Sequence, residues 1–509
     1  MLYAILVALA VLVVLYRRRK SANNLPTPPG PPSLPLIGNV QHIPQHAAWI
    51  GFNEMGKKYG DMLYFHTFKR SIVVLNSAKA AHDLLDKKSA IYSNRPYFAM
   101  THDVIGWEWA LPIMDYGEKF KRHRRYLEEY FRKRRLPNYY ATQTREVHRT
   151  LFDLLEDPEN YQIHFKRLAG GITMMMSYGH EVKSKDDEFI KIAEKGVATI
   201  DAAGAVGAHI VDFFPWLRHV PDWMPGAGFK RLPPGTKDDM HAFVNRPFEE
   251  VQKRMAEGTE TPCYCTALLE DTKGQDNDGV RDTAAITFSA GFDTTFSALL
   301  TALIAMVLNP IIQARAQAEM DIVVGKERLP TFEDREHLPY LQCIVTEALR
   351  WGATTPVGVP HRLCQDDVYN GYLLPKDSMI IANAYAMLYD PDVYPNPEQF
   401  DPDRFLAGEG RSPQPDPRGP AFGFGRRVCP GKDVAENNIW ISIASLFYAF
   451  KVSPAVDEKG KEIPIDSTFA EHSVRHPKPF KCTIKPRREN SRALIQQAAW
   501  SKGVMSGNH

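Results

Sequence analysis

Residues 422–431 read FGFGRRVCPG. It places Cys429 in a glycine-rich loop, two residues after Arg427. Glycines let the backbone turn tightly, so that its N–H groups can point at the sulfur, and a neighbouring aromatic ring keeps water away. A thiolate needs both features to survive beside iron. The stretch therefore predicts that Cys429 is the axial ligand of a haem iron.

A lone cysteine in a loop is more often a buried structural residue. That alternative explains neither the glycines nor Arg427. The pattern F-x-x-G-x-R-x-C-x-G fixes five positions, and chance would place it in a chain of this length on the order of once in ten thousand sequences. We therefore treat the loop as a haem site.

The loop resembles the haem-binding signature of the cytochrome P450 monooxygenases. This resemblance implies a mainly α fold with small β-sheets, and haem b as the cofactor. Within the signature it implies a set of haem-contacting residues, namely Phe422, Gly425, Arg427, Cys429 and Gly431.

Composition is that of a globular chain with a sizeable core. The 509 residues would permit two or three domains, and the resemblance favours one. Hydrophobic residues make up 44% and charged residues 24%, and the net charge of +2 gives no reason to expect nucleic-acid binding. The six cysteines show no C-x-x-C pair and no zinc-like spacing, which favours a reducing, cytosolic environment.

The amino end predicts a membrane anchor. An apolar run from Leu2 to Tyr16 is followed at once by the basic residues 17–20, whereas a secretory signal carries its positive charge before the apolar run. The positive-inside rule leaves the rest of the chain in the cytosol. We therefore expect an anchor in the endoplasmic reticulum membrane at 1–20, a stiff proline-rich hinge at 21–46, a catalytic domain at 47–487 and a loose carboxy-terminal extension at 488–509.

A long helix is predicted from Arg281 to Asn309, ending before Pro310. One face carries small and hydroxylated residues, which suits either close helix packing or the approach of a large flat group. Asp293 favours the second interpretation, because a charge in an apolar helix is costly without a task. Residues 290–295, AGFDTT, resemble the family's A-G-x-D-T-T, which implies that Ala290 and Gly291 contact haem and that Asp293 and Thr294 are catalytic in oxygen activation.

Residues 119–135 hold nine Lys and Arg side chains on a predicted helix. A solvated face is the usual reason for such a run, and a nucleic-acid surface would need a distinctly basic domain. The resemblance implies instead that this helix lies under the haem, that Arg124 reaches a propionate, and that Phe120 stands where the family has tryptophan. It also implies docking of NADPH-cytochrome P450 reductase, with cytochrome b5 as a second candidate donor.

Two further motifs follow in the order found in the family. Glu347 and Arg350 form an E-x-x-R pair, and Arg404 in FDPDRF, residues 400–405, would complete a buried ionic triad that holds the cysteine loop. His361 matches the position of a histidine that binds the second propionate. Residues 354–359 would line the substrate pocket.

The pocket is expected to be apolar. The loop at 96–112 is either an ordinary packed loop or, as the family's fold implies, the roof of this pocket, and we expect the roof. We expect Trp107, Phe288 and Val357 to line the pocket. The aromatic segment at 213–225 fits either core packing or a contact with the membrane interface, and we weigh these evenly.

The predicted reaction is insertion of one oxygen atom from O2 into a terpenoid, polyketide or aromatic molecule, with NADPH electrons delivered by the reductase. Residues 366–376, DDVYNGYLLPK, look most like P450s of mushroom-forming fungi, including O-methylsterigmatocystin oxidoreductase-like enzymes and tryptamine hydroxylases, which suggests secondary metabolism. The alternatives are a haem-thiolate isomerase or dehydratase that uses no O2, and a non-catalytic haem sensor. Asp293 and Thr294 argue against both.

Overall fold

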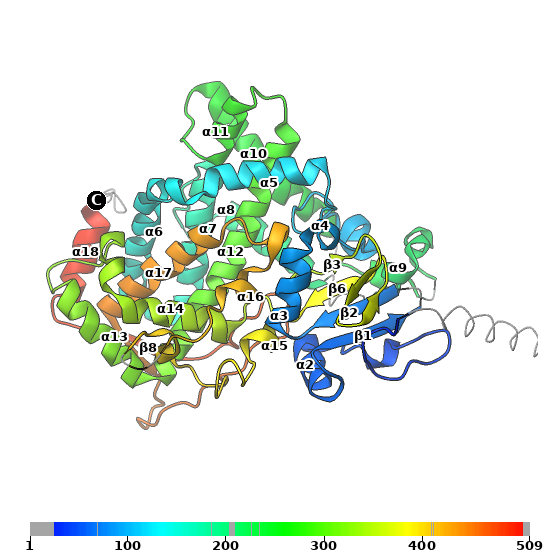
Figure 1. Cartoon of the computed structure of the whole chain (residues 1–509). Coiled ribbons are helices and arrows are strands. Elements are labelled where there is room, and N and C mark those ends of the chain that lie inside the picture. Colours follow the sequence, from blue (N-terminus) through cyan, green and yellow to red (C-terminus); the bar gives the residue numbers. More distant parts are fainter. Residues whose placement is uncertain are drawn as a thin grey trace, which may run out of the picture.

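The structure is a computed structural model that describes residues 25–501, except positions 69, 185, 203–208, 225, 234, 409 and 411. The predicted anchor at 1–20 lies outside the described residues. Helices dominate; β1, β2, β3 and β6 lie at one side, beside α2 and α3, and β8 lies at the other side, near α13 and α14 (Figure 1). The predicted mainly α fold with small β-sheets is confirmed.

The α-helices are α2 (Ala48–Tyr59), α3 (Ala78–Ala81), α4 (Ser89–Tyr92), α5 (Glu118–Phe131), α6 (Pro137–Glu156), α7 (Tyr161–Tyr178), α8 (Glu188–Ala202), α9 (Ile210–Phe213), α10 (Thr236–Glu257), α11 (Tyr264–Asp271), α12 (Asn277–Leu308), α13 (Pro310–Val323), α14 (Pro339–Gly352), α15 (Ala384–Leu388), α16 (Arg418–Phe422), α17 (Lys432–Ala449) and α18 (Ser491–Ser501). Short 3-10 turns are η1 (Val40–His42), η4 (Lys133–Arg135), η5 (Pro158–Asn160), η6 (Pro215–His219), η7 (Ala227–Lys230), η8 (Phe332–His337), η9 (Pro402–Phe405) and η10 (Gly425–Arg427). Two π-helical turns are η2 (His82–Lys87) and η3 (Met100–Ile105).

The main sheet has the strand order β1-β2-β6-β3. Strands β1 (Met62–Thr67) and β2 (Arg70–Leu75) pair antiparallel, β2 pairs parallel with β6 (Met379–Ala382), and β6 pairs antiparallel with β3 (His361–Arg362). Two-stranded sheets are formed by β4 (Asp367–Tyr369) with β5 (Tyr372–Leu374), and by β7 (Phe450–Pro454) with β8 (Cys482–Pro486). The pairing of β2 with β6 brings the amino-terminal third of the chain against the segment that precedes the cysteine loop.

Helix α12 is the central element of the helical body, and it contacts α5, α7, α10, α14 and α17 (Figure 1). The Asp276 carboxylate caps its start by accepting the Gly279 N–H, and Pro310 lies two residues beyond its last residue, Leu308. Among the described residues it is the only helix long and apolar enough to cross a membrane, yet 78% of its most apolar window is buried inside the protein. It is therefore the core helix that the sequence predicted, and begins four residues earlier than expected.

The proline-rich stretch is extended, as predicted, but its described part is bound to the domain. The Pro29 carbonyl accepts the Tyr64 N–H at 2.9 Å, and the Pro26 carbonyl accepts the Leu373 N–H at 2.8 Å. These bonds join it to β1 and β5. The described part of the predicted hinge is therefore held to the sheets at Pro26 and Pro29.

The carboxy-terminal segment is also more ordered than predicted. Helix α18 packs against α6, with Ile495 and Ala499 fully buried. The expectation of a loose extension was wrong for residues 491–501, because their apolar side chains recur at helical spacing and find an apolar partner face.

Candidate active site

The cysteine loop lies between α16 and α17. It leaves α16 through Gly423, which has φ +82°, passes through the turn η10, and reaches Cys429 two residues before Gly431, the N-cap of α17. The Cys429 N–H donates to the Phe422 carbonyl at 2.8 Å, which closes the loop. This bond fixes the sulfur relative to both helices.

The surroundings of Cys429 act on its charge in opposite directions. Burial raises the pKa of the thiol, whereas the Gly431 N–H and the positive charges of Arg124 and Lys432 lower it. The Arg124 guanidinium also donates to the Val428 carbonyl, directly before the cysteine. The loop therefore supplies the N–H donor that the glycines predicted, and stabilises a thiolate once a metal takes the proton's place.

Cys429 opens onto a cavity of about 360 Å³. The cysteine loop forms one wall, and α12 contributes another through Thr287, Ala290, Gly291, Thr294 and Ala298. Helix α5 contributes Phe120, Arg124 and Leu127. Of the predicted site residues, nine line this cavity: Phe422, Arg427, Cys429, Gly431, Arg124, His361, Ala290, Gly291 and Thr294.

The two remaining predicted residues lie just outside the lining. Gly425 has φ +54° and lies against the backbone of η2, where its N–H donates to the Asp86 carboxylate. Asp293 does not line the cavity, and its Oδ1 lies 3.1 Å from Nε2 of His476. The adjacent positions 293 and 294 thus face different surroundings, as their rotation of about 100° on a helix requires.

One edge of the cavity is cationic. Arg427 donates to the carbonyls of Ser93 at 2.8 Å and Met114 at 2.7 Å, and Arg95 donates to the carbonyls of Pro112 and Val359, both at 2.6 Å. Burial lowers the pKa of Arg95, which the charge of Arg427 lowers further, and burial lowers that of Arg427 to about 10. The carboxylate nearest this edge is that of Asp115, which accepts the backbone N–H of Arg95 at 3.2 Å and acts on Arg427 through its charge, but no ion pair joins it to either guanidinium among the described residues.

His361 joins this edge from β3. Its Nδ1 lies 2.8 Å from the Tyr92 carbonyl, which makes Nδ1 the protonated nitrogen and leaves Nε2 for the cavity. Burial lowers the pKa of His361, and the charge of Arg95 acts in the same direction. Buried cationic groups without anionic partners, beside a thiol, fit a flat iron-binding ring that carries carboxylates.

Phe120 occupies the position at which the family has tryptophan. The Arg427 guanidinium lies 3.8 Å from the centre of its ring. The ring therefore packs against the cation of the cysteine loop, a contact that needs an aromatic face and no indole N–H.

Small residues on α12 serve both close helix packing and the cavity wall, the two alternatives that the sequence left open. A Cβ added to Gly291 would lie 2.5 Å from Cγ2 of Thr173 on α7, so this glycine allows close helix packing. Ala290 and Thr294 face the cavity. The Thr294 hydroxyl donates to the Ala290 carbonyl at 2.6 Å, which directs its lone pairs outward as acceptors.

The predicted ionic triad is present. Arg350 binds Glu347 through two bonds of 2.7 and 2.8 Å, and both side chains are fully buried. Arg404 Nε lies 3.4 Å from Glu347 Oε1 and donates to the Pro395 carbonyl at 2.6 Å. The triad therefore ties α14 to η9 and to the segment that leads into the cysteine loop.

The predicted pocket aromatics do not line the cavity. Trp107, Phe288 and Phe243 form a buried stack, with Phe288 and Phe243 5.7 Å apart, and Val357 packs in the core. Of the loop at 96–112, only Leu111 and Pro112 reach the cavity, whereas Thr354, Thr355, Gly358 and Val359 do so as predicted. Apolar side chains can be buried by packing on one another as well as at a cavity wall. The expectation that Trp107, Phe288 and Val357 line the pocket was therefore wrong.

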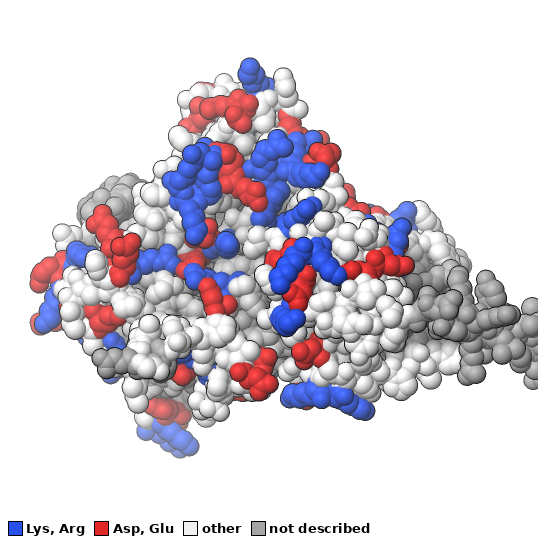
Figure 2. Space-filling view, viewed as in Figure 1, with Lys and Arg blue, Asp and Glu red and all other residues white. Residues whose placement is uncertain are grey.

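The basic surface is less uniformly positive than the sequence suggested. Helix α5 ends at Phe131, and 133–135 form a separate turn. Lysines and arginines gather over α5, with acidic groups among them (Figure 2). Ion pairs join Arg122 to Asp276 at 2.7 Å and Lys119 to Asp282 at 3.2 Å, and Glu129 is surrounded by arginines 132, 134 and 135.

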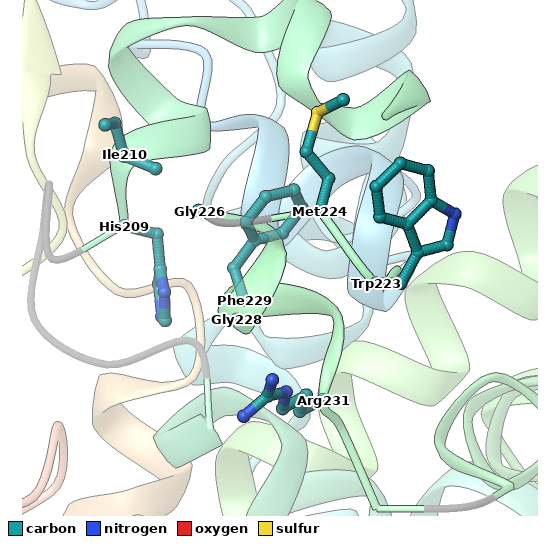
Figure 3. A pocket seen from close by; sticks show the side chains of 8 residues that line it. All are labelled: His209, Ile210, Trp223, Met224, Gly226, Gly228, Phe229 and Arg231. Carbon is teal, nitrogen blue, oxygen red and sulfur yellow. The ribbon is translucent and has the colours of Figure 1, made fainter. Parts of the chain in front are cut away.

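A second, open pocket of about 660 Å³ lies in the segment 209–231. His209 and Ile210 border it from one side, and Trp223 and Met224 from the other (Figure 3). Trp223 is 79% exposed and Trp216 is 64% exposed, so core packing does not account for these two indoles.

Two residues of the site were missed by sequence reasoning. Arg95 is a single arginine before Pro96, without a spacing pattern, and only the fold brings it to Arg427. His476 lies in a loop without a motif. The one usable signal in the sequence was that Arg95 directly precedes the apolar loop at 96–112.

Comparisons with known proteins cover nearly the whole chain. The family model described as Cytochrome P450 matches residues 28–484. Cytochrome P450 monooxygenase 208 of Postia placenta is 38% identical over 97% of this chain and 96% of its own length. Tryptamine 4-monooxygenase of Psilocybe cyanescens is 36% identical over 93% of this chain and 96% of its own length.

Proposed function

Since the chain belongs to the cytochrome P450 family and is a haem-thiolate monooxygenase, we propose that it hydroxylates a neutral, hydrophobic metabolite. The cofactor is haem b, and NADPH supplies the electrons through a reductase. The relatives include an enzyme named for tryptamine, and we propose secondary metabolism as the setting here.

The observation that supports the proposal is the cavity itself. Cys429 lies on one wall and Thr294 on another, with apolar and small residues between them. Haem bound there supplies activation of O2, with the thiolate favouring O–O cleavage. The residues that would hold it are Cys429 through sulfur and Arg95, Arg124 and Arg427 through their positive charge, whereas the neutral His361, whose Nδ1–H is taken by the Tyr92 carbonyl, lines the same edge.

We assign Thr294 and Asp293 to proton supply. A hydroxyl that already donates to the Ala290 carbonyl can accept a hydrogen bond from a water molecule, and so hold that water at the cavity wall. The carboxylate of Asp293 is outside the cavity and can return protons to that water. This division of roles speaks against an isomerase or a sensor, which need no proton delivery for O2 reduction.

The substrate class follows from the lining. Among the described residues, no Asp or Glu borders the cavity, so a protonated amine would find no carboxylate there. Thr287, Thr354 and Thr355 offer hydroxyls on an otherwise apolar surface. We infer a compact neutral terpenoid, polyketide or aromatic molecule with one or two polar substituents.

Membrane association is proposed from two adjacent apolar segments. Leu36 is 93% exposed and follows the predicted anchor, and the neighbouring Ile37 accepts the Phe68 N–H through its carbonyl. The Phe68 ring in turn lies 5.3 Å from that of Phe213, which leads to the exposed Trp216. Exposed indoles suit the interface of the endoplasmic reticulum membrane. The basic surface of α5, on another part of the domain, is the proposed docking face for the reductase and for cytochrome b5.

The test uses the full-length protein with reductase, NADPH and isotopically labelled O2. Neutral terpenoids, aromatic polyketides and indole amines are screened for a spin-state shift of the haem, and the compounds that bind are incubated and analysed by mass spectrometry. We expect a neutral compound to gain one labelled oxygen atom per NADPH consumed. A product that forms without O2, or a preference for the amines, would contradict the proposal.

A further inference from the structure

The contact between Asp293 and His476 joins the middle of α12 to a loop 183 residues later. Nε2 of the imidazole lies 3.1 Å from the carboxylate oxygen Oδ1. The side chain of His476 is 21% exposed and that of Asp293 is 18% exposed, so the pair lies at the border between the protein interior and solvent. Thr294, the next residue, lines the cavity.

The loop around His476 is fixed to the helical body. Arg475 donates to the Gly352 carbonyl at 2.9 Å, its N–H donates to the Thr354 carbonyl at 2.8 Å, and its guanidinium lies 4.3 Å from the centre of the Phe469 ring. Ser297, one turn after Asp293 on α12, donates its hydroxyl to the Arg475 carbonyl. These bonds place the imidazole against Asp293 independently of the ion pair.

The surroundings of the imidazole contain few other charges. Phe296 packs beside it with ring centres 5.6 Å apart, and Lys166 of α7 lies 5.6 Å from that ring. Lys166 is itself paired with Glu194 at 2.7 Å. On the loop, Arg475 is directed to Gly352, and Lys478 is paired with Asp466 at 3.2 Å. Asp293 is therefore the carboxylate that His476 contacts.

We propose that His476 is a positioning residue that takes protons from solvent and hands them to Asp293. A carboxylate has no proton to give until it receives one, whereas the imidazole of a part-exposed histidine can take a proton from water and donate it to a neighbouring oxygen. The imidazolium passes the Nε2 proton to Oδ1, Asp293 passes a proton on toward the water at Thr294, and His476 is reprotonated from solvent. The inference rests on the role of Asp293 stated under the proposed function.

The test compares His476→Gln, Asp293→Asn and the double variant with the parent. Glutamine keeps an N–H donor for Asp293 but cannot relay a proton. His180→Gln is the matched control, because His180 is also a part-exposed histidine, paired with Asp187 at 2.8 Å, and does not line the cavity. All proteins must first show the parent's reduced carbon monoxide spectrum, which establishes an intact haem site.

The first readout is independent of turnover. It uses NMR of the reduced, carbon monoxide-bound protein labelled with 15N-histidine. The ring-nitrogen signals of His476 are identified by their absence from His476→Gln. Asp293→Asn should shift these signals and leave those of His180 in place. Unshifted signals would show that the contact does not exist in solution and would overturn the inference.

The second readout is O2 consumption with reductase and substrate, measured in H2O and D2O. We expect His476→Gln to slow consumption about tenfold, since one proton-transfer group contributes on the order of a hundredfold and water replaces part of it. The solvent isotope effect should increase, added imidazole should restore part of the rate, and the double variant should be no slower than Asp293→Asn. If Asp293→Asn slows O2 consumption but His476→Gln keeps the parent's rate and isotope effect, the inference is overturned and the proposed function stands. Parent-like rates in both variants would overturn the role of Asp293 as well.

Discussion

The glycine at position 425 makes a sharp test of how the cysteine loop is held. An added Cβ would lie 2.1 Å from the Leu85 carbonyl oxygen and 3.2 Å from the Ser89 Cβ. An ordinary contact needs about 3.4 Å, so Gly425→Ala must move the loop or η2 by more than about 1 Å. The positive φ of +54° costs an L-residue about 1 kcal/mol, and overpacking adds about 1–3 kcal/mol.

We therefore expect Gly425→Ala to lose about 2–4 kcal/mol of unfolding free energy and most of its thiolate-type spectrum, because the displaced loop carries Cys429. A misplacement of about 1 Å costs on the order of a hundredfold in rate. The assay is the reduced carbon monoxide spectrum together with thermal unfolding. Gly419→Ala is the control, since a Cβ there meets nothing within 4 Å. A Gly425→Ala protein with the parent's spectrum and melting temperature would refute the reasoning.

Three further outcomes follow from the geometry. Arg350→Met should cost about 3–5 kcal/mol in denaturant unfolding, because it strands the buried Glu347 carboxylate, and the double variant with Glu347→Gln should lose less; equal losses would contradict this. Burial lowers the pKa of His123 to about 4, so the unfolded protein binds a proton more readily and stability is lost as the pH falls from 6.5 toward 4. The expected loss is about 2 kcal/mol at pH 5. Melting curves at pH 7 and pH 5 should show that His123→Leu removes this loss. Thr294→Ala should keep NADPH and O2 consumption but divert flux to hydrogen peroxide, and a fully coupled variant would place the proton path elsewhere.

Sequence reasoning succeeded where function depends on local spacing. The cysteine loop, the small face of α12 and the pair of Glu347 with Arg350 each lie within one turn or helix, so their spacing alone determines which side chains meet. The third member of the triad, Arg404, followed from motif order. Such features need no knowledge of the remaining fold.

Sequence reasoning failed where distant segments meet. Arg95 reaches Arg427 and His476 reaches Asp293 only because the sheet and the carboxy-terminal loop fold back onto the helical body. Trp107 and Phe288 were wrongly expected in the pocket, because burial in a core and burial at a cavity wall favour the same residue types. The buried face of α18 was missed because its partner on α6 lies more than 300 residues earlier.

The central claim is that Cys429 is the anionic ligand of the haem iron, and the reduced carbon monoxide spectrum of the purified protein tests it most directly. We predict a red-shifted, thiolate-type Soret band in the parent and its loss in Cys429→Ala, since no other side chain of the loop is an anionic donor of that strength. A parent protein without this band, or a Cys429→Ala protein that retains it, would contradict the account.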